Sequence, residues 1–329
     1  MLDGNTSDEV IKHMANCYRL IGNSVQAEYW YSLVVELPDA KPIAYYYYYQ
    51  ALKENRKYDK ALKWMKKYAA IETADTRAKR ELEEQKRLNQ ILRERKDVSV
   101  RNLSINSANA DFGAYIIDEA TVVYASSRDE GKVIKRIYLW DNLPYLDLYK
   151  ADRIRNGNLS NPRKLSEVIN TKYHEGPATF NENGNLIYFT RNNYHEGDVT
   201  KSSENVNNLN IYNAVKVGED WGNVKAFQFN DKEFSTGHPA LDATGNYLYF
   251  SSDRPGGFGG TDIYVCEKIG SEWGVPENLG ETVNTEGDEM FPFVDPRGVL
   301  FFCSDGHLNL GGLDIFYSVP TDSAFSEAV

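Results

Sequence analysis

The sequence contains few cysteines and has no excess of basic residues. Cys17, Cys266 and Cys303 are the only cysteines among 329 residues. Their number and spacing fit neither a disulfide framework nor a CxxC metal site. The 37 lysines and arginines are outnumbered by 48 aspartates and glutamates, which leaves a formal net charge of −11. Because nucleic-acid binders carry basic stripes, this balance argues against a nucleic-acid partner.

Long apolar runs are missing as well. No stretch approaches the roughly 20 apolar residues of a membrane span, so we predict no transmembrane segment. The first ten residues lack the basic start and apolar run of a signal peptide. A chain that begins Met1-Leu2-Asp3-Gly4 without such a signal is expected to be cytoplasmic or to be a piece of a longer protein.

A four-residue phrase recurs four times in the last two thirds of the chain. The copies are Leu146-Asp147-Leu148-Tyr149, Leu209-Asn210-Ile211-Tyr212, Thr261-Asp262-Ile263-Tyr264 and Leu313-Asp314-Ile315-Phe316. From position 147 to 210, 262 and 314, the second residue recurs after 63, 52 and 52 residues. An aromatic strand pattern precedes each copy, and an asparagine-bearing connector opens each unit. A period of this length indicates one supersecondary unit copied along the chain.

Strand patterns of period two, with turn signals inside each unit, favour propeller blades of four strands. We therefore predict a β-propeller over residues 98–329, built from four blade units. The polar second residue of the phrase is of a type depleted in strands. We expect Asp147, Asn210, Asp262 and Asp314 to accept hydrogen bonds from a neighbouring turn or blade.

The two ends of this array decide whether the propeller closes. Residues 98–103 resemble an outer strand without a blade of its own, and the fourth unit lacks an outer strand. Pairing of residues 98–103 with Asp314–Ser318 would indicate a closed four-blade ring. We instead expect an unfinished propeller that belongs to a longer protein.

Residues 1–75 carry helical patterns with a spacing of 34 residues. Ala27 and Ala61 occupy equivalent early positions in the second helix of each pair, as in tetratricopeptide repeats. Residues 76–97 mix charges of both signs with a thin apolar stripe, which predicts a charged capping or linker helix. The predicted fold class is α plus all-β and multidomain: a short tetratricopeptide helical module, then a partial, four-unit β-propeller.

The helical part contains an unusual run of five tyrosines, Tyr45–Tyr49. The helical register places Tyr46 in the concave groove and most of the other rings on the packing face. We predict that Tyr46, with its groove neighbours Gln50 and Lys53, contacts a partner. The alternative is that Tyr46 only packs in the core.

Polar residues near the starts of the inner strands are the candidate partner-binding residues of the propeller: Asp111, His174, Glu175, His238, Asp288 and Glu289. The histidines lack HxH and HExxH spacing, so we expect a polar rim around the channel and no metal site. Carboxylates gathered from several blades could form a glycosidase-type acid–base pair, and this alternative stays open. The glycine-rich segment 255–260 leads into a strand, so it is expected to be structural and not a phosphate cradle. No catalytic set and no cofactor is predicted.

Several phrases resemble those of a known family. They are Trp64-Met65-Lys66-Lys67-Tyr68, His174-Glu175-Gly176-Pro177, Tyr188-Phe189-Thr190-Arg191-Asn192-Asn193, Gly237-His238-Pro239-Ala240-Leu241, Asp253-Arg254-Pro255-Gly256-Gly257 and Asp288-Glu289-Met290-Phe291-Pro292-Phe293. Together they resemble the OmpA family envelope proteins of Bacteroidota, with tetratricopeptide repeats and a WD-repeat-like, TolB-like propeller. The resemblance covers nearly the whole chain.

This resemblance implies about six blades, a small β domain and an OmpA-like domain that grips peptidoglycan. The last blades, the OmpA-like domain and a signal peptide are not seen in this sequence, so peptidoglycan binding is expected only through a domain outside it. The resemblance also implies a periplasmic, outer-membrane-associated location, with some members similar to accessory components of type IX secretion and gliding. We predict a non-enzymatic protein-interaction scaffold that binds other envelope proteins. The alternative is a glycan-binding or hydrolytic propeller that uses carboxylates at the channel mouth.

Overall fold

The computed structural model describes residues 7–83, 87, 90, 93, 99–128, 137–321 and 324–329. The chain forms two compact units. The first contains Met1–Asp97, Thr285–Gly287 and Ser304–Ile315, and the second contains Val98–Asn284, Asp288–Cys303 and Phe316–Val329. The first unit therefore combines the helices with two short segments from the last third of the sequence.

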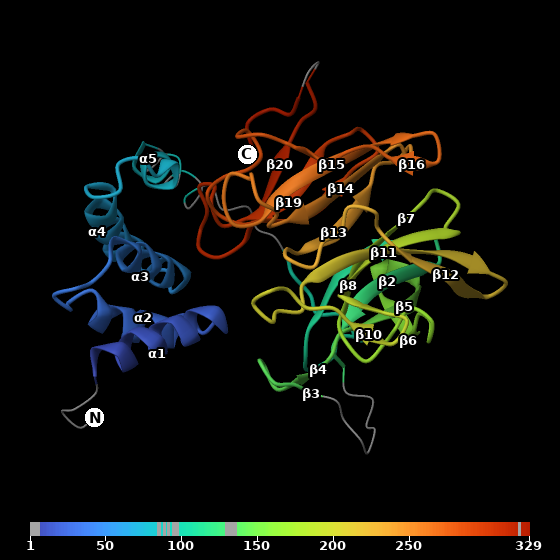
Figure 1. Ribbon diagram of the computed structural model, residues 1–329, viewed down its shortest axis with the longest axis horizontal. Helices are drawn as coiled ribbons and strands as arrows, with labels where there is room; N and C mark the ends of the chain where they lie inside the picture. The colour runs from blue at the N-terminus through green and yellow to red at the C-terminus, as the bar shows by residue number, and fades with distance from the viewer. Residues whose placement is uncertain are drawn as a thin grey trace. The chain divides into compact units, whose positions relative to one another are not determined.

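Among the described residues, the first unit contains these helices (blue to cyan in Figure 1): α1 (Asp8–Leu20), α2 (Ser24–Val34), α3 (Pro42–Glu54), α4 (Tyr58–Ala69) and α5 (Thr76–Glu83). Side chains cap the first two. Ser7 Oγ accepts from the backbone N–H of Val10 at 3.4 Å, and Asn23 Oδ1 accepts from that of Gln26 at 3.1 Å. Pro42 opens α3, because its fixed φ and missing N–H suit a first helical turn.

The first four helices pack as two successive pairs. Ala27 in the first pair and Ala61 in the second are buried and small, so that the helices approach closely. Trp30 and Met65 fill the space beside them. Helices are thus confirmed where the sequence predicts them, while their membership of the tetratricopeptide class stays a prediction. Most of the predicted helix over 76–97 beyond α5 lies outside the described residues.

Four antiparallel sheets form the blades of a β-propeller (green to red in Figure 1). The first blade consists of β1 (Asp111–Ile116), β2 (Thr121–Ser126), β5 (Asp147–Arg153) and β6 (Leu159–Lys164), and the second of β7 (Glu175–Phe180), β8 (Leu186–Asn192), β11 (Leu209–Val217) and β12 (Asp220–Ala226). The third consists of β13 (Thr236–Leu241), β14 (Tyr247–Ser252), β15 (Asp262–Ile269), β16 (Glu272–Trp273) and β17 (Glu277–Asn278), and the fourth of β18 (Glu289–Val294), β19 (Leu300–Ser304) and β20 (Asp314–Ser318). Two small hairpins stand apart, β3 (Ile137–Tyr138) with β4 (Leu143–Pro144), and β9 (Tyr194–His195) with β10 (Asp198–Val199).

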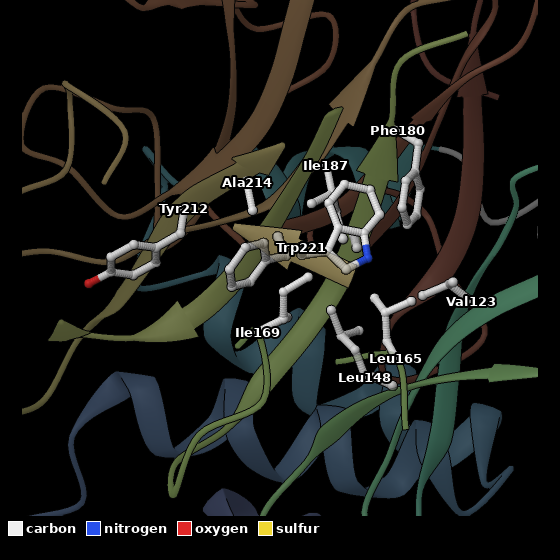
Figure 2. Close-up of a cluster of buried hydrophobic side chains, with 12 residues drawn as sticks. Val123, Leu148, Leu165, Ile169, Phe180, Ile187, Tyr212, Ala214 and Trp221 are labelled. Carbon is white, nitrogen blue, oxygen red and sulfur yellow. The ribbon is translucent and has the colours of Figure 1, made fainter. Parts of the chain in front are cut away.

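Successive blades pack face to face through apolar clusters. Figure 2 shows the cluster in which Val123 and Leu148 of the first blade meet Phe180, Ile187 and Trp221 of the second. Similar clusters join the second blade to the third and the third to the fourth. Because side chains alternate between the two faces of a strand, the Leu or Ile at the third position of the phrase fills these clusters in the first three copies.

The last residues of the chain cover the edge of the fourth sheet. Tyr317 N donates to Val329 O, and Val329 N donates to Tyr317 O, both at 3.0 Å. The chain can reach this edge because it turns back after β20, where Pro320 bridges Phe325. The sequence suggested that residues 98–103 could supply the outer strand of the last blade. Leu103 instead packs on the first blade. Residue 98 lies outside the described part of the chain.

Candidate functional site

An arginine in the second blade ties three parts of that blade together. Arg191 Nε donates to Glu175 Oε1 at 3.1 Å, and Arg191 Nη2 donates to the carbonyl oxygen of Ile169 at 2.5 Å. The guanidinium carbon lies 5.0 Å from the ring centre of Tyr212. Glu175 opens the inner strand, Ile169 lies in the connector and Tyr212 ends the repeated phrase. We call this arrangement the arginine clasp.

The clasp recurs in the first and third blades. Arg128 Nη2 donates to Asp111 Oδ1 and to the carbonyl oxygen of Ile105, both at 3.1 Å. In the third blade, Arg254 Nη2 lies 3.4 Å from Thr236 Oγ1, so that a hydroxyl replaces the acid. Each of these arginines also lies against the ring of its own phrase tyrosine. The repeated clasp was missed in the sequence, although Arg follows a small polar residue in all three units.

The clasps hold two of the predicted carboxylates inside their own blades. Glu175 is fully buried and also accepts from Thr171 N at 3.0 Å and Thr171 Oγ1 at 2.7 Å. Burial raises the pKa of Glu175 to about 8, against the opposing effect of Arg191. At Asp111 burial also acts to raise the pKa, but hydrogen bonds such as that from Ser126 Oγ at 2.6 Å hold the pKa below its ordinary value.

The acids of the fourth blade occupy comparable places. Glu289 opens β18, as Glu175 opens β7, and is fully buried. Asp288 Oδ1 accepts from Thr261 N at 2.9 Å. In the first and third blades, the clasp arginine stands two residues after a serine. In the fourth blade, the residue two positions after Ser304 is Gly306, so this blade has no arginine at the corresponding position. The predicted acids thus lie at the starts of the inner strands of three blades, with Asp288 and Glu289 both in the fourth. The bonds described here account for Asp111, Glu175 and Asp288 structurally.

Asparagines in the connectors bind the repeated phrase through the backbone. Asn170 Oδ1 accepts from Leu148 N at 2.8 Å, and Asn170 Nδ2 donates to Leu148 O at 3.0 Å. The same two bonds recur between Asn230 and Ile211 and between Asn284 and Ile263. A side-chain amide here imitates the paired bonds of a neighbouring strand.

The polar second residues of the phrase are structural in three units. Asp262 Oδ2 accepts from Phe258 N at 2.6 Å, Asp314 Oδ2 accepts from Leu310 N at 2.6 Å, and Asp147 Oδ2 pairs with Lys164 Nζ at 2.7 Å. Asn210 differs, because its buried Oδ1 has no hydrogen-bond partner within the described residues. The prediction of bonds from a neighbouring turn is therefore confirmed for Asp262 and Asp314, whereas Asp147 pairs with the outer strand of its own blade. It is wrong for the Asn210 oxygen.

The inner strands of all four blades line a central cavity of about 160 Å³. His238 and Phe291 lie on its wall with left-handed backbones, at φ values of 52° and 55°. Bulky residues in this region cost about 1–3 kcal/mol each. Their rings stack with centroids 4.0 Å apart. The left-handed backbone at these two positions thus places two stacked aromatic rings on the channel wall.

His238 is a neutral member of the channel wall. Burial lowers its pKa to about 4, so the imidazole is uncharged near neutral pH. Its backbone N–H donates to Thr190 Oγ1 of the second blade at 2.8 Å. Its buried Nδ1 has no hydrogen-bond partner among the residues that the structure describes. His238 thus lines the channel, while its contact with a partner stays a prediction.

His174 belongs to a surface strip of partly exposed rings, which we call the aromatic strip: Tyr138, Tyr145, Tyr173, His174 and Tyr194. His174 lies 4.6 Å from both Tyr138 and Tyr145, measured between ring centroids. Its Nδ1 accepts from Leu146 N at 3.1 Å, which places the proton of the neutral ring on Nε2. Burial lowers the pKa of His174 and favours this neutral form.

An exposed tryptophan adjoins the aromatic strip. Trp140 lies in the turn of the β3–β4 hairpin and is 54% exposed, and its neighbour Leu139 is exposed as well (hairpin labelled in Figure 1). Exposed rings of this kind are typical of binding surfaces. The sequence interpretation missed this surface, because its tyrosines come from three segments that are separate in the sequence.

Tyr46, Gln50 and Lys53 are the residues of the helical part that were predicted to contact a partner. The segment 304–315 of the same unit covers the groove in which they lie. Tyr46 is buried, and Gln50 Nε2 donates to Tyr46 OH at 3.2 Å and to Asp305 Oδ2 at 3.5 Å. Lys53 is buried too, with its Nζ 2.8 Å from Glu81 Oε2. The expectation that Tyr46 and Lys53 are open to a partner does not match their burial, although partner binding itself stays untested.

Backbone bonds reinforce this arrangement within the first unit. Arg80 Nη1 donates to the carbonyl oxygen of Gly306 at 3.1 Å. Glu286 accepts from Thr76 N at 2.9 Å and from Thr76 Oγ1 at 2.6 Å, at the first residue of α5. The segments 285–287 and 304–315 therefore contact the helices through Glu286 and Gly306.

The described part of the chain contains neither a membrane-spanning helix nor a cluster of metal-binding side chains. None of its helices is both long and apolar enough to cross a membrane. Its His, Cys, Asp and Glu side chains form no group of three or more that could hold a metal ion.

No protein-family model matches the sequence, and no curated protein matches it significantly. Solved structures similar to the chain include TolB from Acinetobacter baumannii (15% identity, 66% of this chain and 43% of that chain, TM-score 0.38). Others are a thermostable family-43 glycoside hydrolase (10%, 65% and 72%, TM-score 0.43) and a gluconolactonase from Xanthomonas campestris (13%, 67% and 79%, TM-score 0.34). The chain spans less than half of the TolB chain. At these identities and scores, the similarities carry no argument about function.

Proposed function

We propose that the protein is a non-enzymatic protein-interaction scaffold of the bacterial cell envelope. The observation that carries this proposal is the arginine clasp. A glycosidase needs two carboxylates that face one substrate from either side. Asp111 and Glu175 instead open two different blades and bind the arginine and hydroxyl groups of their own blades.

The proposed partner surface is the aromatic strip together with Trp140. Tyrosine and tryptophan offer large contact areas at low conformational cost, and they dominate the binding energy of many interfaces. His174 adds a hydrogen-bond donor at Nε2. The phrase resemblance supports a periplasmic, outer-membrane-associated place, with helix pairs of the tetratricopeptide class and a role beside type IX secretion or gliding components.

Crosslinking in cells that produce the full chain tests the scaffold. Trp140→Ser combined with Tyr145→Ser should remove the crosslinked partner, because both changes delete aromatic contact area. Tyr247→Ser, at a 40% exposed tyrosine outside the strip, should retain the partner. Retention by the double variant contradicts the assigned surface. If the chain hydrolyses a glycan and Glu175→Gln abolishes this activity without unfolding the protein, the protein is an enzyme and the scaffold proposal is wrong.

A further inference from the structure

The third residue of each inner strand lies on the wall of the central cavity. These residues are Gly113, Pro177, His238 and Phe291. Gly113, His238 and Phe291 have left-handed backbones, with φ values of 63°, 52° and 55°. Glycine adopts this conformation without strain, because it has no Cβ atom. The first blade has glycine at this position, whereas the third and fourth blades have ring-bearing residues there.

Two rings thus stand at positions whose backbone favours glycine. A left-handed backbone at a bulky residue lowers stability, and strain of this kind is concentrated at binding and active sites. The rings of His238 and Phe291 both line the cavity, and they stack with an interplanar angle of 20°. The strained positions therefore point to a role for this ring pair in the cavity itself.

The imidazole of His238 is the polar side-chain group that remains available in this wall. Tyr115 OH donates to the carbonyl oxygen of Phe180 at 3.1 Å, and Thr179 Oγ1 accepts from Leu241 N at 3.1 Å. His238 Nδ1 has no hydrogen-bond partner among the described residues. A ligand in the cavity can therefore form a hydrogen bond with the imidazole without displacing another group.

The rest of the wall is uncharged. Pro177, Pro239 and Pro292 line the cavity and have no backbone N–H to donate. No aspartate, glutamate, lysine or arginine occurs among the described residues that line it. His238 is neutral near pH 7, because burial lowers its pKa to about 4. A charged ligand would lose its hydration here without gaining an ion-pair partner, so the wall favours a neutral ligand.

The cavity volume of about 160 Å³ limits the size of the ligand. An apolar cavity of about 150 Å³ holds one benzene ring, and aromatic rings attract a further ring in offset or edge-to-face geometry. We propose that the central cavity binds a small neutral aromatic compound, a single planar ring with one hydroxyl or N–H group that bonds to His238. This site shares no residue with the aromatic strip, so the inference does not rest on the scaffold proposal.

Isothermal titration calorimetry of the full chain with phenol tests this inference. Phenol is a neutral planar ring with one hydroxyl group, and we expect a dissociation constant of about 1 mM or lower. Benzoate has the same ring with a negative charge and should bind at least about tenfold more weakly. Equal binding of phenol and benzoate contradicts a site for neutral ligands, and undetectable binding of phenol at about 10 mM overturns the site.

Two variants test whether phenol binds in the cavity. His238→Gly removes the imidazole and suits the left-handed backbone. Ala114→Phe fills the cavity from the first blade, at an exposed alanine of its wall. Each variant should weaken phenol binding at least about tenfold. Ala226→Phe is the matched control, because this alanine of β12 is also exposed and lies outside the cavity wall; it should leave binding unchanged.

Circular dichroism and thermal unfolding check that each variant is folded. Should His238→Gly fail to fold, Ala114→Phe still tests the cavity. Phenol binding that Ala114→Phe leaves unchanged places the ligand elsewhere and overturns the inference. Binding that Ala114→Phe blocks but a folded His238→Gly retains at full strength overturns the assigned hydrogen bond.

Discussion

At the scale of single residues, the arginine clasps explain why the inner strands of the first two blades begin with an acid. Each guanidinium satisfies a connector carbonyl and an inner-strand oxygen, and it packs on a tyrosine ring. Its planar group of several donors suits this task better than a lysine ammonium. The two acids nevertheless differ in their titration, because Glu175 is buried more deeply than Asp111.

Glu175 should make stability depend on pH near neutrality. Its pKa rises from the ordinary value of 4.5 to about 8 in the folded chain, so the folded state binds the proton more tightly. The associated stability is complete below about pH 4.5 and is lost as the pH rises through about 8. Urea unfolding between pH 5 and 8 should show a fall of roughly 2–4 kcal/mol, which Glu175→Gln removes.

Asp111→Asn is the control for this pH dependence. The pKa of Asp111 is lowered, so its linked stability is lost only as the pH falls below the ordinary range of aspartate. The Asp111→Asn variant should therefore show the same fall in the free energy of unfolding between pH 5 and 8 as the unmodified chain. An unchanged decline in Glu175→Gln would show that another group titrates.

Removal of the clasp arginine should be costly. Above about pH 8, where Glu175 is charged, Arg191→Met leaves this buried carboxylate without its ion-pair partner, which should lower the free energy of unfolding by about 3 kcal/mol. Arg163→Met breaks the pair with Asp152, whose side chains are about two-fifths exposed, and should cost no more than about 1 kcal/mol. Equal losses of unfolding free energy in the two variants would show that the clasp stabilises the fold no more than an exposed ion pair does.

At the scale of elements, the connector asparagines extend the hydrogen bonding of a sheet beyond its strands. Asn170→Ala leaves the buried N–H and C=O of Leu148 without these two bonds. We expect a loss of about 2 kcal/mol in chemical unfolding. Asn213→Ala removes only one 3.4 Å bond to a backbone oxygen and should change stability by less than about 0.5 kcal/mol. A neutral Asn170→Ala would contradict the strand-like role.

The strands and blades could be predicted from the repeated phrase, because alternation and turns act locally along the sequence. The same phrase also indicated which side chains are structural, as Asp262 and Asp314 confirm. The groove residues could not be placed in this way. Lys53 is buried because Glu81 and segments more than 200 residues away cover the groove, and helical register contains no information about them.

At the scale of the whole molecule, the first unit is discontinuous in sequence. Its helices are completed by the segments 285–287 and 304–315, so part of the groove is filled by the chain itself. Gly311 fits there because its backbone, at a φ of 121°, lies close to that of Lys53 and Glu54, where a Cβ atom would come within 2.9 Å. Binding of another partner in this groove would have to displace the segment.

Glu286 provides the test of this discontinuous unit. Its carboxylate accepts from the N–H and the hydroxyl of Thr76, as a capping side chain does at the start of a helix. Glu286→Ala should destabilise the start of α5 by about 1 kcal/mol, equivalent to roughly fivefold faster amide hydrogen exchange there. Glu281→Ala, at an exposed acid of the same connector, should leave exchange in α5 unchanged. Identical exchange in both variants would mean that Glu286 does not hold the helix in solution.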